Sequence, residues 1–193
     1  MQKPTDKPNI LNDIPSNSEL AAIRVIHAPE SIAEIILRDA KITQLPVNLY
    51  QIADFLKITV SENENPQDVN SDNEIIKGSV TEMDKDIILN PKFDNPRFAL
   101  ALFLGDIVCR NIIANHFHWS KNQYNWMRTL ITFGNDMSPK QFIKLQEHIA
   151  IAILMPKQQF MKKYNSGEPY ENIAADFNVT DVELRYRLNT LGL

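Results

Sequence analysis

Six side chains of the types that ligate metal ions lie in or beside two apolar segments of this chain: Asp106, Cys109, His116, His118, Glu147 and His148. Such groups bind zinc and related metals when at least three of them converge. Their spacing argues against convergence, because His116 and His118 share no helical face and a lone cysteine among apolar residues is typical of a core. The sequence leaves open whether some of these groups form a metal site.

Other common catalytic motifs are absent from the sequence. The 5 glycines form no G-x-G-x-x-G or Walker A phosphate loop, and there is no G-x-S-x-G nucleophile elbow. Cys109 lies in an apolar segment with no obvious base beside it, a setting that leaves a thiol inert. We therefore expect no catalytic residue and no cofactor.

The elements that would position these side chains are mainly helical. Apolar residues that recur at spacings of three and four predict helices over 20–26, 29–40, 46–57, 97–114, 139–154, 157–164, 170–177 and 182–191. Ser138 before Pro139 is typical of a helix start, and Thr180 is suited to cap the last helix. Residues 115–137 show no clean period, so we expect an irregular connection there.

Short β-rich runs over 58–60, 74–81 and 86–89 predict a small antiparallel three-stranded sheet, with a hairpin between the second and third strands. The fold class is therefore α+β and mostly helical. We expect a flexible tail over 1–17, one domain over 18–156, and a C-terminal helical extension over 157–193 that packs on it.

A resemblance to a known family rests on several segments. Residues 97–106, RFALALFLGD, resemble the active-site helix of the ImmA/IrrE family of zincin-like metallopeptidases, whose frame reads R-F-x-x-A-H-E-x-G-H. Residues 150–156, AIAILMP, resemble the helix end F-A-x-x-L-L-M-P of that family. Residues 174–193 resemble its closing segment A-x-x-F-x-V-S-x-x-A-L-x-x-R-L-x-x-L-G-L. The resemblance covers about residues 45–193 and implies a zincin-like domain with a helix-turn-helix-like coda.

The chain departs from that family at the metal site. A zincin helix needs two histidines four residues apart, with a glutamate beside the first to take a proton from zinc-bound water. Leu102, Asp106 and Phe103 stand at those positions. The family's third ligand is a glutamate in the later helix, where the stretch around Leu145 has no carboxylate. These four residues are therefore vestigial positions of a zinc motif, and the hydrolytic mechanism of the family cannot operate on them.

The resemblance thus implies a fold without its activity. Active members cut or control helix-turn-helix repressors, and a member without metal ligands would keep only the binding. We expect a catalytically inactive pseudo-peptidase that binds a protein, such as a helix-turn-helix repressor, as an antirepressor or regulator in a phage, mobile-element or defence system. The former cleft, lined by Leu102, Phe103 and Leu145, would be filled as core or reused as an apolar groove.

Two alternatives come from other functional classes. The first is a metal-dependent hydrolase whose site has been relocated. The second is a DNA-binding transcriptional regulator that uses its C-terminal helices. Residues 157–193 contain five basic and five acidic side chains, whereas a DNA reader normally carries a basic surplus. We therefore expect no direct nucleic-acid binding, and expect Arg185 and Arg187 to be solvated or paired.

Composition sets the remaining limits. In 193 residues, 20 Lys and Arg against 24 Asp and Glu give a net charge of -4, which argues against attraction of the whole surface to nucleic acid or anionic lipid. One cysteine, no apolar signal sequence and no membrane-spanning run predict a cytoplasmic protein with no membrane partner. Self-association stays open.

Aromatic residues in the segment after the central helix supply a first prediction. Trp119, Tyr124 and Trp126 are candidate partner-binding residues, because aromatic side chains bury large areas at protein interfaces. The alternative is that they cap the hydrophobic core. If they bind a partner, Trp119→Ala or Trp126→Ala should weaken binding or self-association by about 2 kcal/mol or more and leave the fold intact. Loss of folding in both variants, with unchanged binding per folded molecule, would assign them to the core.

Overall fold

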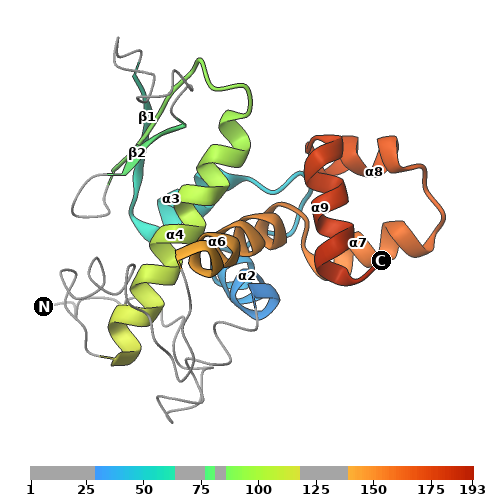
Figure 1. Ribbon diagram of the computed structural model, residues 1–193, viewed down its shortest axis with the longest axis horizontal. Helices are drawn as coiled ribbons and strands as arrows, with labels where there is room; N and C mark the ends of the chain where they lie inside the picture. Colours follow the sequence, from blue (N-terminus) through green and yellow to red (C-terminus); the bar gives the residue numbers. More distant parts are fainter. Residues whose placement is uncertain (1–28, 64–76, 81–85, 118–138) are drawn as a thin grey trace, which may run out of the picture.

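The computed structural model describes residues 29–63, 77–80, 86–117 and 139–193 (Figure 1), with the side chains of 31, 109–117 and 139–142 left aside. This part of the chain contains seven helices and three short strands. They are α2 (Pro29–Asp39), α3 (Leu49–Leu56), β1 (Thr59–Glu62), β2 (Gly78–Val80), β3 (Asp86–Leu89), α4 (Pro96–Phe117), α6 (Pro139–Leu154), α7 (Lys157–Asn165), α8 (Tyr170–Phe177) and α9 (Asp181–Leu191). The mostly helical α+β prediction is confirmed.

Most predicted helices agree with the observed ones to within a few residues, and α6 and α8 agree at both ends. The connection predicted to begin at residue 115 starts too early, because α4 continues to Phe117. Asn115–Phe117 contains no helix breaker, and extending a formed helix costs little. The predicted helix over 20–26 and the tail over 1–17 lie outside the described residues.

The sheet is mixed, and the antiparallel prediction is wrong for one of its two pairings. The strand order is β1-β3-β2, with β3 antiparallel to β2 and parallel to β1. The hairpin is therefore confirmed, but β3 lies between the other two strands. Ile87 and Leu89 of β3 are buried, whereas β1 is mostly exposed. The most apolar strand, β3, lies at the centre, where both of its edges are paired. Because successive strands alternate in direction along the chain, β1 and β3 run parallel.

The main core lies between four helices and the sheet. α6 packs against α4 and α2, and α3 packs against α4 and β1. Helices α4 and α6 approach closely at Gly105, where a Cβ atom would lie 3.3 Å from the carbonyl oxygen of Gln146.

Within the described residues, no helix is both long and apolar enough to cross a bilayer.

A second core joins the C-terminal helices to α6. Ile151 of α6 and Met155, directly after it, pack with residues of α7, α8 and α9, among them Phe160, Phe177 and Leu184. In Figure 1 these three helices form a group at the right, with α9 on the side nearest the rest of the molecule. The second half of α6 is therefore buried from two sides.

A buried ion pair ties α9 to α2. The Arg187 side chain is 0% exposed and forms two hydrogen bonds with the Glu30 carboxylate, Nη2 to Oε2 at 2.8 Å and Nη1 to Oε1. Its guanidinium lies 5.9 Å from the centre of the Phe160 ring. Among the described residues its Nε has no hydrogen-bond partner. Of the two alternatives predicted for Arg187, solvated or paired, the structure shows the paired one, with the side chain buried.

This ion pair gives a stability prediction. Glu30→Gln should lower the free energy of unfolding by about 3 kcal/mol, because it leaves a buried guanidinium without its counterion. Adding Arg187→Met should restore much of that loss, since the unpaired charge is gone. Urea unfolding of both variants measures the effect. A double variant no more stable than Glu30→Gln would contradict this account.

Candidate functional site

The vestigial positions, which the resemblance assigns to a zinc motif, lie on α4 at residues 102, 103 and 106 and on α6 at residue 145. Leu145 is 4% exposed, and Leu102 and Phe103 are partly buried against the same core. Three of the four positions therefore make apolar contacts in this structure.

The fourth position, Asp106, is paired across the two helices. Its Oδ1 accepts a hydrogen bond from Nε2 of Gln146, which is 8% exposed. The resemblance places the third-ligand position on α6 around Leu145. The α6 side chain that reaches Asp106 is its neighbour Gln146. This hydrogen bond joins α4 to α6. One carboxylate and one amide do not provide the three protein ligands that a zinc site needs.

The two other α6 candidates face a different helix. Glu147 accepts a hydrogen bond of 3.1 Å from the Tyr186 hydroxyl of α9, and the His148 ring centre lies 5.6 Å from that of Tyr186. Cys109, His116 and His118 are outside the described side chains, as are Trp119, Tyr124 and Trp126. Within the described residues, no three His, Cys, Asp or Glu side chains could share a metal ion.

The contact between α6 and α9 shifts two titrations. Burial lowers the pKa of His148, and Lys144 and Arg187 lower it further, while Glu147 and Glu30 oppose the shift. Burial and the Glu147 carboxylate raise the pKa of Tyr186 to about 12. Both residues are therefore neutral at physiological pH, so the Tyr186 hydroxyl remains a donor to Glu147.

Arg97, the first residue of the resembling segment, has a structural role. It donates hydrogen bonds to the carbonyl oxygens of Val47, at 2.9 Å, and Asn178, at 3.2 Å. Burial lowers the pKa of its guanidinium, and the Glu183 carboxylate opposes that shift. Arg97 thus joins the start of α4 to the segment before α3 and to the turn between α8 and α9.

The C-terminal helices form a helix-turn-helix arrangement. Asn178 has a left-handed backbone at the end of α8, and Thr180 caps α9 in a capping box with Glu183. The Glu183 carboxylate also accepts a hydrogen bond of 2.9 Å from Asn95 at the start of α4. The predicted cap at Thr180 is confirmed, and its partner Glu183 also attaches α9 to α4.

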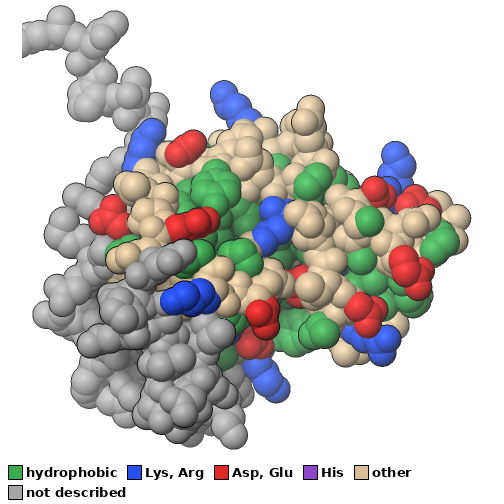
Figure 2. Space-filling view, turned by 90° about the horizontal axis from the view of Figure 1, so that it is seen from above, with side chains coloured by type: hydrophobic (Ala, Val, Ile, Leu, Met, Phe, Trp, Pro, Cys, Tyr) green, Lys and Arg blue, Asp and Glu red, His purple; other side chains and the backbone are tan. Residues whose placement is uncertain are grey.

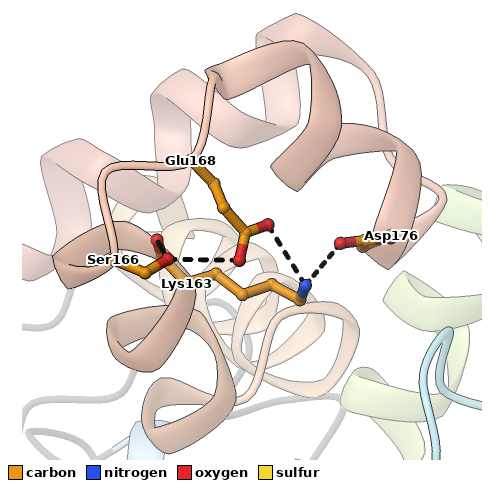
Figure 3. Close-up of polar contacts among 4 residues, drawn as sticks. All are labelled: Lys163, Ser166, Glu168 and Asp176. Carbon is orange, nitrogen blue, oxygen red and sulfur yellow. Dashed lines mark hydrogen bonds and ion pairs between the residues drawn. The ribbon is translucent and has the colours of Figure 1, made fainter.

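A polar cluster holds α7 against α8 (Figure 3). Lys163 contacts the carboxylates of Glu168, at 3.3 Å, and Asp176, and Ser166 donates a hydrogen bond of 3.1 Å to Glu168. The hydrogen bond to Asp176 raises the pKa of Lys163. Charges over the C-terminal helices are interspersed in sign on the face shown in Figure 2, with no continuous basic patch there.

A cavity of about 510 Å³ lies between α9 and the helices α4 and α6. We name it the α9 groove. Its lining residues are Asn95, Phe98, Glu147, Ile151, Thr180, Val182, Glu183, Arg185, Tyr186 and Asn189. Phe98 lies one helical turn before Leu102, and none of the four vestigial positions lines the groove. Sequence reasoning did not single out this surface, because residues 95–98, 147–151 and 180–189 come together only in the folded chain.

The lowered pKa of His148 predicts how stability depends on pH. The folded state disfavours the charged imidazole, so its contribution to stability is complete above the unfolded pKa of about 6.5 and falls as the pH drops below it toward the lower folded value. Wild type should therefore lose more free energy of unfolding than His148→Gln between about pH 7.5 and pH 5.5. Urea unfolding at the two pH values tests this, and equal losses in the two proteins would contradict it.

Comparison with known proteins gives a likeness in fold. A solved structure of a Mycobacterium tuberculosis transcriptional regulator aligns with 95% of this chain at a TM-score of 0.59 and 16% sequence identity. The alignment covers 52% of the regulator, so this chain spans about half of its length. No family model matches the sequence, and no curated protein matches it.

Proposed function

We propose that this chain is a catalytically inactive ImmA/IrrE-like protein that acts by binding a protein partner, as a regulator or antirepressor in a phage, mobile-element or defence system. The observation that carries the proposal is the Asp106–Gln146 hydrogen bond between α4 and α6. It occupies the one polar vestigial position, while Leu102, Phe103 and Leu145 make apolar contacts. The likeness in fold to a transcriptional regulator is compatible with a regulatory role.

A second candidate is a DNA-binding regulator. It is favoured by the helix-turn-helix arrangement of α8 and α9 and by the likeness in fold to a transcriptional regulator. A recognition helix must place its first turns in the major groove of DNA. In this chain Val182 and Tyr186 of α9 line a groove against α4 and α6, and Tyr186 is bonded to Glu147. Asp181 and Val182 in the first turn of α9 are exposed, but Asp181 pairs with Arg185 there, so this turn offers no basic surplus to DNA, which favours protein binding.

Metal content and DNA binding test the two candidates. We expect protein purified without added metal to contain no stoichiometric zinc and to have no peptidase activity. About one zinc per chain would overturn the proposal, since stoichiometric zinc needs a ligand set that the vestigial positions lack. Affinity for duplex DNA that falls steeply with salt concentration would favour the DNA-binding candidate.

Restoring the motif gives a sharper prediction. The triple variant Leu102→His, Phe103→Glu, Asp106→His should show no robust hydrolysis, because α6 supplies no third ligand. Phe103→Glu should cost about 2 kcal/mol of folding free energy by placing a carboxylate against the core. Zinc affinity, peptidase activity and melting temperature are the measurements. Robust hydrolysis by the triple variant would mean that another residue supplies the third ligand.

A matched pair of additions distinguishes the two candidate positions on α6. Adding Gln146→Glu to the triple variant should increase zinc affinity, because residue 146 is the α6 side chain that reaches residue 106. Adding Leu145→Glu instead should destabilise the protein by about 3 kcal/mol, because it buries a carboxylate. Equal zinc affinity in the two quadruple variants would contradict the assignment to residue 146.

A further inference from the structure

The α9 groove has an apolar interior that continues onto exposed apolar side chains. Phe98 of α4 and Tyr186 of α9 line it, and Ile151 of α6 lies beneath them with no exposed surface. Val182, one turn before Tyr186 on α9, is 76% exposed. Ile143, two turns before Ile151 on α6, is 49% exposed. Val182 thus extends the apolar surface of the groove along α9, a pattern that marks interaction sites, whereas Ile143 lies beyond Glu147 and outside the lining.

The charges around the groove are mainly negative. Glu147 lies on the α6 wall and is partly exposed, whereas Glu183 of α9 is 6% exposed and is bonded to Thr180 and Asn95. Arg185 is the one basic residue in the lining, and its Nε is 2.8 Å from the Asp181 carboxylate. Asp181 therefore balances the charge of Arg185. The two side chains are 66% and 75% exposed, so the pair lies at the rim of the groove. The accessible charge inside the groove is therefore the Glu147 carboxylate.

We propose that the α9 groove binds an amphipathic helix of a protein partner that carries an apolar stripe flanked by a lysine or arginine. A helix suits the site because the groove runs between helices, so its length matches a helical segment. Side chains at i, i+3 or i+4 and i+7 of a bound helix would contact Phe98, Tyr186 and Val182. A basic residue beside them would face Glu147, and complementary charge would select such helices over acidic ones.

This inference deepens the proposed function, since it rests on the chain acting by protein binding, and names the chemistry of the partner. It uses neither the zinc motif nor the resemblance to a peptidase family. The zinc and peptidase measurements can therefore contradict the proposed function without contradicting this inference, and the reverse also holds.

The experiment uses the full chain and three fluorescently labelled amphipathic helical peptides. The peptides share one leucine stripe and differ in the flanking residue, which is lysine, glutamine or glutamate. By fluorescence anisotropy, we expect the lysine peptide to bind wild type about ten-fold more tightly than the glutamate peptide. Glu147→Lys should abolish or reverse this order, whereas Glu171→Lys, the same charge change at an exposed position of α8, should keep it.

A second pair of variants tests the apolar part. Val182→Ser should weaken binding of the lysine peptide several-fold, whereas Tyr170→Ser, which removes an exposed aromatic side chain outside the groove, should leave it unchanged. Equal affinity for the three peptides, or equal effects of Glu147→Lys and Glu171→Lys, would overturn the proposal. A dimer of this chain that Val182→Ser dissociates would also overturn it, by assigning the groove to a second copy.

Discussion

Seven consecutive residues of α6 and the turn after it, Ile149–Met155, have no exposed surface. A helix that is apolar on all sides cannot lie on the surface of a domain, so it must be covered from every direction. Helices α2 and α4 cover it on one side and α9 with its neighbours on another. The C-terminal helices are thus part of the burial of α6, and the ion pair between Arg187 and Glu30 joins α9 to α2 as well.

The first half of α6 obeys a different constraint. Gln146 points to α4, while Glu147 and His148 point to α9. Successive residues of a helix face different directions, so three polar neighbours in sequence serve two separate contacts. This separation explains why Asp106, Glu147 and His148 form no common site. The close approach at Gly105 further limits the space beside Asp106, and the hydrogen bond from Gln146 satisfies a partly buried carboxylate there.

Sequence alone predicted the local features well and the long-range ones poorly. Helices α6 and α8 were predicted at both ends, because prolines begin them and the chain that follows them breaks the periodicity. The central place of β3 was missed, since strand order depends on which strand is best covered and not on any local pattern. The pairing of Asp106 with Gln146 was missed for a similar reason: it depends on the rotation of two helices about their axes, which a four-residue period does not fix.

Two of the vestigial positions, Leu102 and Asp106, lie on the same side of α4 as Phe98, which lines the α9 groove. Phe98, Leu102 and Asp106 are spaced by four residues, so they occupy one face of that helix in successive turns. The contacts of this face differ from turn to turn. Asp106 is hydrogen-bonded to α6, Leu102 packs on the core, and Phe98 lines the groove. At the Phe98 end of this face, α9 forms the third wall of the groove. A partner bound there would therefore contact α4, α6 and α9 together.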